Sequence, residues 1–337
     1  MPDNDLSQID CVLFEPETNV RHLLREALSR LRIQNLQVFG HMEDVWKAFQ
    51  GGNPDLLIAD ATSPDSETFK LVQSVRHSLV GANPFIGIIV TAFHPTGALL
   101  TKVTNCGADA LLVKPVAFRQ IQDRINGLID QPRNFVVTSD FIGPDRRRAP
   151  REGSPIPLLE VPNTLKMKAT SSFAKVNPQA LIEAGIRDVN EQKLLRHAFQ
   201  AAFLIEFALP AEAGGNGADG KADKLALDHL ARVGPVLEDI VRRLPSPISG
   251  SRARIPDLAH DLAASVEIAR SQGLSGRPPS DPDRLRESAL EIMQALSPDK
   301  DPQSLARDVG SAAAAYRARL IAIVAAKSAI SQSSTVA

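Results

Sequence analysis

The stretch DLLIADATSP (residues 55–64) decides the fold of the first part of this 337-residue chain. The breakers GGNP (residues 51–54) come directly before it, and the apolar run LLIA then ends on an acid, Asp60. A short apolar run of this kind is typical of a strand that is buried on both faces of a sheet. The stretch therefore predicts an inner strand with a carboxylate at its carboxyl end.

Similar strand patterns lie on both sides of this stretch, and helical patterns separate them. We expect strands at residues 9–14, 36–39, 55–60, 85–91 and 110–113, and helices at residues 20–31, 45–49, 69–76, 96–105 and 118–128. This alternation predicts a parallel sheet with helices on both faces. Functional side chains of such sheets gather at the carboxyl ends of the strands. Here those ends carry Glu15, Asp60, Thr91 and Lys114.

The residues at these strand ends resemble the receiver domain of bacterial response regulators. The resemblance rests on DLLIADATSP around Asp60, on IIVTAF around Thr91 and on the tripeptide VKP that contains Lys114. It covers residues 9–130 and implies a five-stranded, parallel, flavodoxin-like α/β domain over residues 1–130. It also implies that Asp60 accepts a phosphoryl group, that Thr91 and Lys114 bind its oxygens, and that the bond to Pro115 is cis.

The same resemblance implies a hard divalent cation, Mg²⁺, beside the phosphoacceptor. The family pattern assigns Glu15, Asp60 and Thr62 to this cation. Phosphoryl transfer depends mainly on positioning and on charge neutralisation, and Mg²⁺ prefers oxygen ligands. The implied protein is a regulatory phosphoacceptor and not an enzyme, with slow autodephosphorylation at most.

Two residues depart from the family pattern. Receiver domains usually carry two adjacent acids after the first strand, but here Pro16 follows Glu15 and has no side-chain oxygen for a metal. Leu111 stands where the family often places an aromatic ring that reports phosphorylation. We therefore expect a lowered affinity for Mg²⁺. The departures also favour an alternative, in which a pseudo-receiver acts as a scaffold or adaptor that binds partners without phosphorylation.

The sequence changes character after residue 130. Residues 131–168 contain six prolines and a basic segment, GPDRRRAPR (residues 143–151), and we expect a linker over residues 131–175. The basic segment could bind a phosphate or an acidic partner, or it could be a solvated linker. Helical patterns return over residues 176–335, which predict a mainly helical domain of unknown function.

Composition narrows the class of protein. The net charge is -1, so the whole chain has no electrostatic preference for nucleic acid, and nucleic-acid binding is disfavoured. A transcriptional regulator with an unrecognised helical DNA-binding domain remains a further alternative, supported by a basic face near Arg242, Arg243, Arg252 and Arg254. No stretch reaches the roughly 20 apolar residues of a membrane span, and no export signal is recognisable. We expect a cytoplasmic bacterial protein.

Together these patterns predict a response regulator of a two-component system. A sensor histidine kinase or a histidine phosphotransfer protein would donate the phosphoryl group to Asp60. The phosphorylated domain would then regulate a downstream partner protein through protein–protein contacts. The sequence leaves open which kinase is the donor, what the helical domain contacts and whether the chain forms a homodimer.

Overall fold

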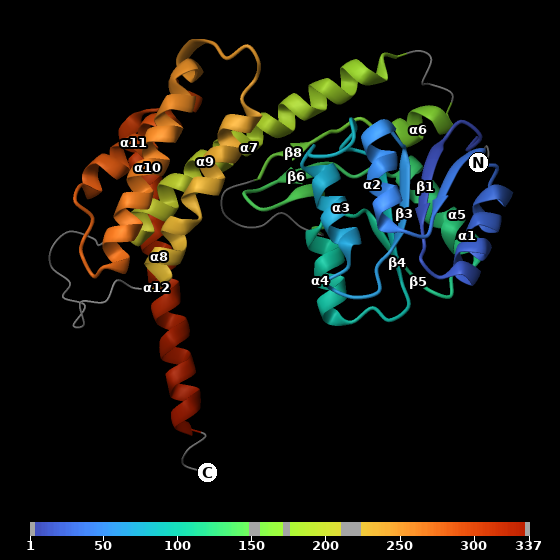
Figure 1. Ribbon diagram of the computed structural model, residues 1–337, viewed down its shortest axis with the longest axis horizontal. Coiled ribbons are helices and arrows are strands. Elements are labelled where there is room, and N and C mark those ends of the chain that lie inside the picture. The colour runs from blue at the N-terminus through green and yellow to red at the C-terminus, as the bar shows by residue number, and fades with distance from the viewer. Residues whose placement is uncertain (1–3, 148–155, 171–175, 210–223, 334–337) are drawn as a thin grey trace. The chain divides into compact units, whose positions relative to one another are not determined.

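A computed structural model gives the structure of the chain and describes residues 4–147, 156–170, 176–209 and 224–333. Contacts divide the chain into two compact units, Met1–Val189 and Asn190–Ala337 (Figure 1). The boundaries predicted at residues 130 and 175 stay predictions. Each unit is described by itself below.

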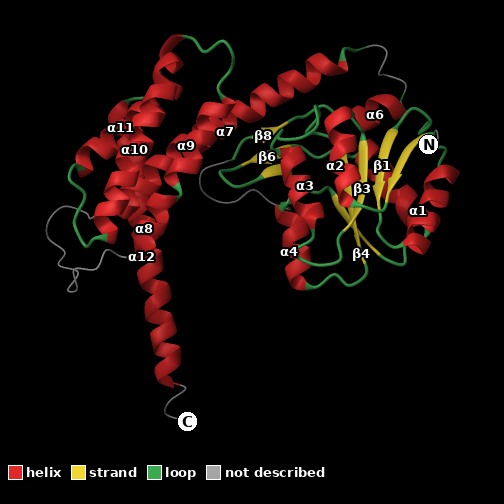
Figure 2. Ribbon diagram, in the orientation of Figure 1, coloured by secondary structure: helices red, strands yellow, loops and turns green. Residues whose placement is uncertain are grey.

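The first unit is built on a five-stranded parallel sheet (Figure 2). Its strands follow the order β2-β1-β3-β4-β5, which is the flavodoxin-like order, and the predicted fold class is confirmed. The strands are β1 (Asp10–Phe14), β2 (Asn35–Phe39), β3 (Leu56–Asp60), β4 (Gly87–Ala92) and β5 (Ala110–Val113). The helices between and after them are α1 (Thr18–Arg30), α2 (Met42–Gly51), α3 (Glu67–Arg76), α4 (Gly97–Asn105) and α5 (Phe118–Asp130).

The apolar run that decides the fold lies at the centre of the sheet. Every residue of β3 is buried. Leu57 and Ala59 pack under α2, α3 and α4, whereas Leu56 and Ile58 pack under α1 and α5. This division follows from the two-residue period of a strand. Because both faces are covered, Asp60 is held at the edge of the sheet by apolar packing on either side.

Residues 131–147 and 156–170 contain regular elements where we expected a linker over residues 131–175. Strand β6 (Phe135–Val137) pairs in antiparallel fashion with β7 (Ile142–Pro144) and with β8 (Leu158–Leu159), and α6 (Thr164–Ala169) follows. Phe135 is buried against Phe85, with ring centroids 5.6 Å apart. These strands are two or three residues long, too short to produce a period in the sequence. The prediction of a linker therefore rested on the prolines of this segment, which are easier to recognise than such short strands.

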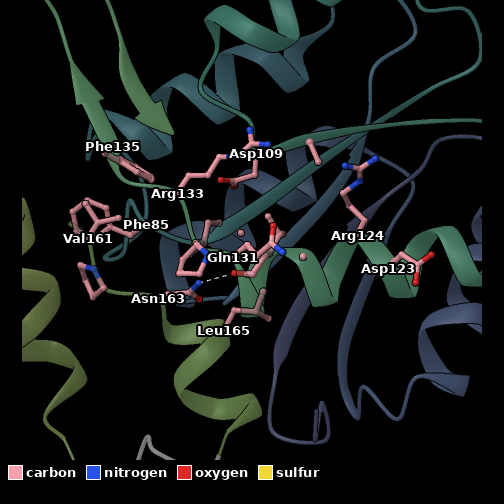
Figure 3. Close-up of a pocket in the computed structure, with 17 residues that line it drawn as sticks. Phe85, Asp109, Asp123, Arg124, Gln131, Arg133, Phe135, Val161, Asn163 and Leu165 are labelled. Atoms are coloured by element: carbon pink, nitrogen blue, oxygen red, sulfur yellow. Dashed lines mark hydrogen bonds between the residues drawn. The ribbon is translucent and has the colours of Figure 1, made fainter. Parts of the chain in front are cut away.

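The segment that contains β6, β7, β8 and α6, which we call the extension, lies against the amino ends of β4 and β5. A cavity of about 190 Å³ lies there, and its lining includes Phe85, Asp109 and Leu165, which Figure 3 draws as sticks. Across it, the Asn163 side chain donates a 2.8 Å hydrogen bond to the carbonyl of Leu128 at the end of α5. The extension is thus part of the first unit's packing.

The second unit is helical in all its described residues except the connections, as predicted. Its core consists of Leu, Ile, Val, Ala and Met side chains from every helix. No helix in the described ranges is both long and apolar enough to cross a membrane. The helices are α7 (Pro178–Ala208, most of which belongs to this unit), α8 (Lys224–Ala231), α9 (Val233–Arg243), α10 (Ile255–Leu274), α11 (Pro282–Leu296) and α12 (Pro302–Ser333), with a short 3₁₀ turn at Gly250–Arg254.

Candidate functional site

The carboxyl edge of the parallel sheet brings three of the predicted residues into contact. Glu15 directly follows β1, Asp60 ends β3 and Lys114 directly follows β5. The Lys114 ammonium lies 2.6 Å from Glu15 Oε2 and 2.5 Å from Asp60 Oδ1. At most 3% of each side chain is exposed. The edge therefore holds a buried ion cluster of two carboxylates and one ammonium, which we call the edge cluster.

Main-chain hydrogen bonds hold each member of the edge cluster. The amide of Glu15 donates to Phe39 O at 3.0 Å, and the amide of Lys114 donates to Ala92 O at 2.8 Å. The carbonyl of Asp60 accepts a 2.5 Å hydrogen bond from the hydroxyl of Thr68, a fully buried residue near the start of α3. The Lys114–Pro115 bond is cis, as expected. Sequence reasoning missed Thr68, because nothing in the local pattern separates it from an ordinary helix residue.

Thr91 lies beside Asp60 on the neighbouring strand, since the two residues are register partners in β3 and β4. Its hydroxyl is buried and has no hydrogen-bond partner. Asp60 Oδ1 is also buried without a hydrogen bond, so its contact with Lys114 is an ion pair without hydrogen-bond alignment. Buried polar atoms without partners are rare in folded proteins and often mark functional sites. Asp60 of the edge cluster and the neighbouring Thr91 thus each have one oxygen with unused hydrogen-bonding capacity.

An aromatic ring that the sequence analysis did not single out covers the cluster. The Phe93 ring centroid lies 4.4 Å from Lys114 Nζ, and 44% of Phe93 is exposed. A cation over a ring face is attracted by the ring's quadrupole. The sequence feature that could have pointed to Phe93 is its place two positions after Thr91. Leu111 packs half-buried in the core on the α2–α4 side of the sheet and offers no ring of its own.

The residues assigned to Mg²⁺ do not fit this cation. The ammonium of Lys114 lies at the point where the carboxylates of Glu15 and Asp60 converge. Pro16 supplies no side-chain oxygen, and Thr62 lies exposed two residues beyond Asp60. Among the residues that the structure describes, no group of three His, Cys, Asp or Glu side chains is arranged to hold a metal. Receiver domains typically bind Mg²⁺, but the described part of this chain shows no such site.

The arginines expected to form a basic face in the helical unit are paired with carboxylates. Arg252 binds Glu191 through two hydrogen bonds of 2.8 and 2.6 Å. Arg254 lies 3.8 Å from Glu291. Arg242 and Arg243 both bind Asp239. The carboxylates offset part of the positive charge on this face, and DNA binding by the helical unit stays a prediction.

The described part of the basic segment makes local contacts. Arg146 donates hydrogen bonds to the carbonyl of Ala108 and, at 3.3 Å, to the hydroxyl of Thr104. Arg147 binds Asp145 at 2.8 Å. Residues 148–151 of the segment lie outside the described residues. Arg146 thus attaches this segment to α4 and to the residues after α4, whereas Arg147 contacts only its own segment.

Comparisons with known proteins find relatives for part of the chain. The transcriptional regulatory protein CusR of Escherichia coli (strain K12) is 28% identical over 145 residues, which are 41% of this chain and 62% of CusR. The DNA-binding transcriptional regulator NtrC of Bradyrhizobium sp. (strain RP501 Parasponia) is 23% identical over 125 residues, 37% of this chain and 25% of NtrC. The match therefore spans less than two thirds of either relative.

A search of solved structures returns the chemotaxis protein CheY4 of Vibrio cholerae, with a TM-score of 0.31 and 17% identity over 35% of this chain and 97% of CheY4. No family model matches the chain. The curated relatives are response regulators, and their alignments cover 41% and 37% of this chain.

Proposed function

The N-terminal part of this chain is a receiver domain of the response-regulator type, and we propose that it accepts a phosphoryl group on Asp60. The donor is a sensor histidine kinase or a histidine phosphotransfer protein in the cytoplasm. The phosphorylated domain then regulates a downstream partner through protein–protein contacts. A regulatory role of this kind requires no enzymatic activity of the chain beyond slow loss of the phosphoryl group.

One observation carries this proposal: the unused oxygens of Asp60 and Thr91 lie on adjacent strands at the same edge. An incoming phosphoryl group offers acceptors to the Thr91 hydroxyl and to the Lys114 ammonium, while an Asp60 oxygen is the nucleophile. Positioning and charge neutralisation are what phosphoryl transfer needs from a protein.

The transfer step balances without a further reactant. A carboxylate oxygen of Asp60 attacks the phosphorus of a phosphohistidine, and a new P–O bond forms as the P–N bond breaks. The electron pair of the broken bond stays on the imidazole nitrogen of the donor. Lys114 is already within 2.5 Å of Asp60 Oδ1, so its positive charge is in place for the charge that collects on the phosphoryl oxygens.

The test is labelling with acetyl phosphate, followed by measurement of the intact mass, with Mg²⁺ and separately with EDTA. We expect the wild-type chain to gain one phosphoryl group and Asp60→Asn to gain none. Asp65→Asn is the matched control, because Asp65 is exposed in the segment that follows β3. It should be labelled like the wild type. Equal labelling of wild type and Asp60→Asn would sink the assignment.

A second function is favoured by the burial of the edge cluster. Asp60 is only 2% exposed, and Lys114 is shared with Glu15, so the site can also persist as a closed structural element. The chain would then be a pseudo-receiver that binds partners without phosphorylation. Absence of labelling under every condition, in a chain that folds normally, would select this function.

A further inference from the structure

We infer that in this receiver the ammonium of Lys114, clamped by Glu15, takes the place of the divalent cation and keeps the site closed to Mg²⁺. The inference concerns the site of the proposed function and adds how that site is regulated: by protein charge alone and not by metal. It assigns Glu15 as a positioning residue for Lys114 instead of a metal ligand.

Both carboxylate oxygens of Glu15 are already bound by the chain. Oε2 accepts from Lys114 Nζ at 2.6 Å, and Oε1 accepts from the amide of Glu17 at 3.1 Å. Glu15 itself is 1% exposed. A metal bound to this carboxylate would have to share each oxygen with a hydrogen-bond donor of the chain in a buried site, where a donor that lost its acceptor would be costly.

The main chain after β1 supplies no replacement ligand. The Arg21 guanidinium donates hydrogen bonds to the carbonyls of Glu15 and Pro16, at 2.7 and 2.9 Å. It also reaches the hydroxyl of Thr18 at 3.2 Å. These bonds direct the loop carbonyls to a guanidinium. The carbonyls of Glu15 and Pro16 are thus engaged by Arg21.

The charges of the edge cluster favour the ammonium over a second cation. Lys114 faces Glu15 from β1, Asp60 from β3 and the Phe93 ring from the segment after β4. A divalent cation placed between the carboxylates would meet the fixed ammonium at contact distance, and like charges repel strongly in a buried site. Metal entry therefore requires that Lys114 leave or that a further carboxylate offset its charge.

Removal of the ammonium should open the site to a metal. Mn²⁺ alone, titrated into the full chain by isothermal calorimetry, is the probe. The wild type should show no saturable binding, whereas Lys114→Met should bind with at least about tenfold higher affinity, because Glu15 and Asp60 are then free. Lys102→Met, an exposed lysine on α4, is the matched control and should behave as wild type. Wild-type binding as tight as that of Lys114→Met would overturn the inference.

A second variant keeps the test meaningful if Lys114→Met does not fold. Pro16→Asp supplies the missing carboxylate and should also gain at least about tenfold in Mn²⁺ affinity. Pro16→Ser removes the proline without adding a charge and should stay like wild type. Tight binding by Pro16→Ser would contradict the inference, because loop freedom and not charge would then be limiting. None of these titrations involves phosphoryl transfer, so this inference and the proposed function fail separately.

Discussion

The two ends of one parallel sheet each hold a buried cation beside a carboxylate, and they differ in how completely that cation is bound. At the amino end, the side chain of Arg76 is 0% exposed and donates to Asp109 Oδ2 at 2.8 Å. It also lies over the Phe135 ring, 5.1 Å from the centroid. Three carbonyls complete its shell, those of Gly107, Pro84 and Ile86, at 2.8, 2.6 and 2.9 Å.

At the carboxyl end, the edge cluster is equally buried but incomplete. Asp60 Oδ1 and the Thr91 hydroxyl have no hydrogen bond, and two carboxylates share one ammonium. Buried polar groups that are fully satisfied rigidify a fold, whereas unsatisfied ones mark strain or function. The comparison teaches that hydrogen-bond completeness, and not burial or charge, separates a structural cation from a site residue in this domain.

The largest expected effect breaks the complete cluster. Arg76→Met leaves Asp109 and three carbonyls without their partner and should lower the free energy of unfolding by about 3–5 kcal/mol. Urea denaturation followed by circular dichroism measures it. Arg30→Met is the control, since the Arg30–Glu26 pair is exposed and i,i+4 pairs of this kind contribute about 0.3–0.5 kcal/mol. A loss no larger than that of the control would show that the carbonyls find other donors.

The helical unit offers a second complete cluster, centred on Asp239. Its Oδ2 accepts from His197 at 2.7 Å and from Arg243 at 2.8 Å, and its Oδ1 binds Arg242. Burial alone would raise the pKa of Asp239, but the hydrogen bonds from His197 and Arg243 outweigh it and hold this pKa far below the ordinary value. By the same criterion, Asp239 is a structural residue.

Asp239→Asn should therefore destabilise the chain by about 2–3 kcal/mol at neutral pH, because charge-assisted hydrogen bonds are lost. Since the pKa is lowered on folding, the stabilisation is present above the unfolded value of 3.8 and is lost as pH falls below it. The difference in urea midpoint between wild type and Asp239→Asn should therefore be smaller at about pH 3 than at neutral pH. Asp257→Asn, an exposed acid on α10, is the control. A constant difference at both pH values would refute the assignment.

The comparison also explains which parts of the molecule the sequence predicts. Asp60, Thr91 and Lys114 each end a short apolar run, so their meeting follows from the parallel sheet alone. The hydrogen-bond partners of Arg76 lie up to 33 residues away, and its burial depends on a loop and on an extension that have no periodic pattern. The sequence placed Glu15 and Lys114 at the same edge, and hydrogen bonding between them follows from that placement. The hydrogen bond from the Glu17 amide to Glu15 could not be predicted, because it depends on the conformation of the loop after β1.

The smallest effect has the opposite sign and tests the comparison most sharply. Asp60→Asn removes one of two carboxylates that share Lys114 and leaves a neutral Glu15–Lys114 pair. Because Asp60 Oδ1 has no hydrogen bond to lose, the free energy of unfolding should rise by about 1 kcal/mol, the gain common when a functional charge is removed.

The matched variant at the other end of the sheet is Asp109→Asn. Asp109 Oδ2 accepts from Arg76 and, at 2.7 Å, from the amide of Ile88, so this variant should lose stability, by about 2–3 kcal/mol. The two aspartates therefore differ in the sign of the change, although each lies beside a buried cation. Urea denaturation of both variants in the same buffer decides the matter. If Asp60→Asn lost as much stability as Asp109→Asn, Asp60 would be a structural residue, and the pseudo-receiver function would be the better account of this domain.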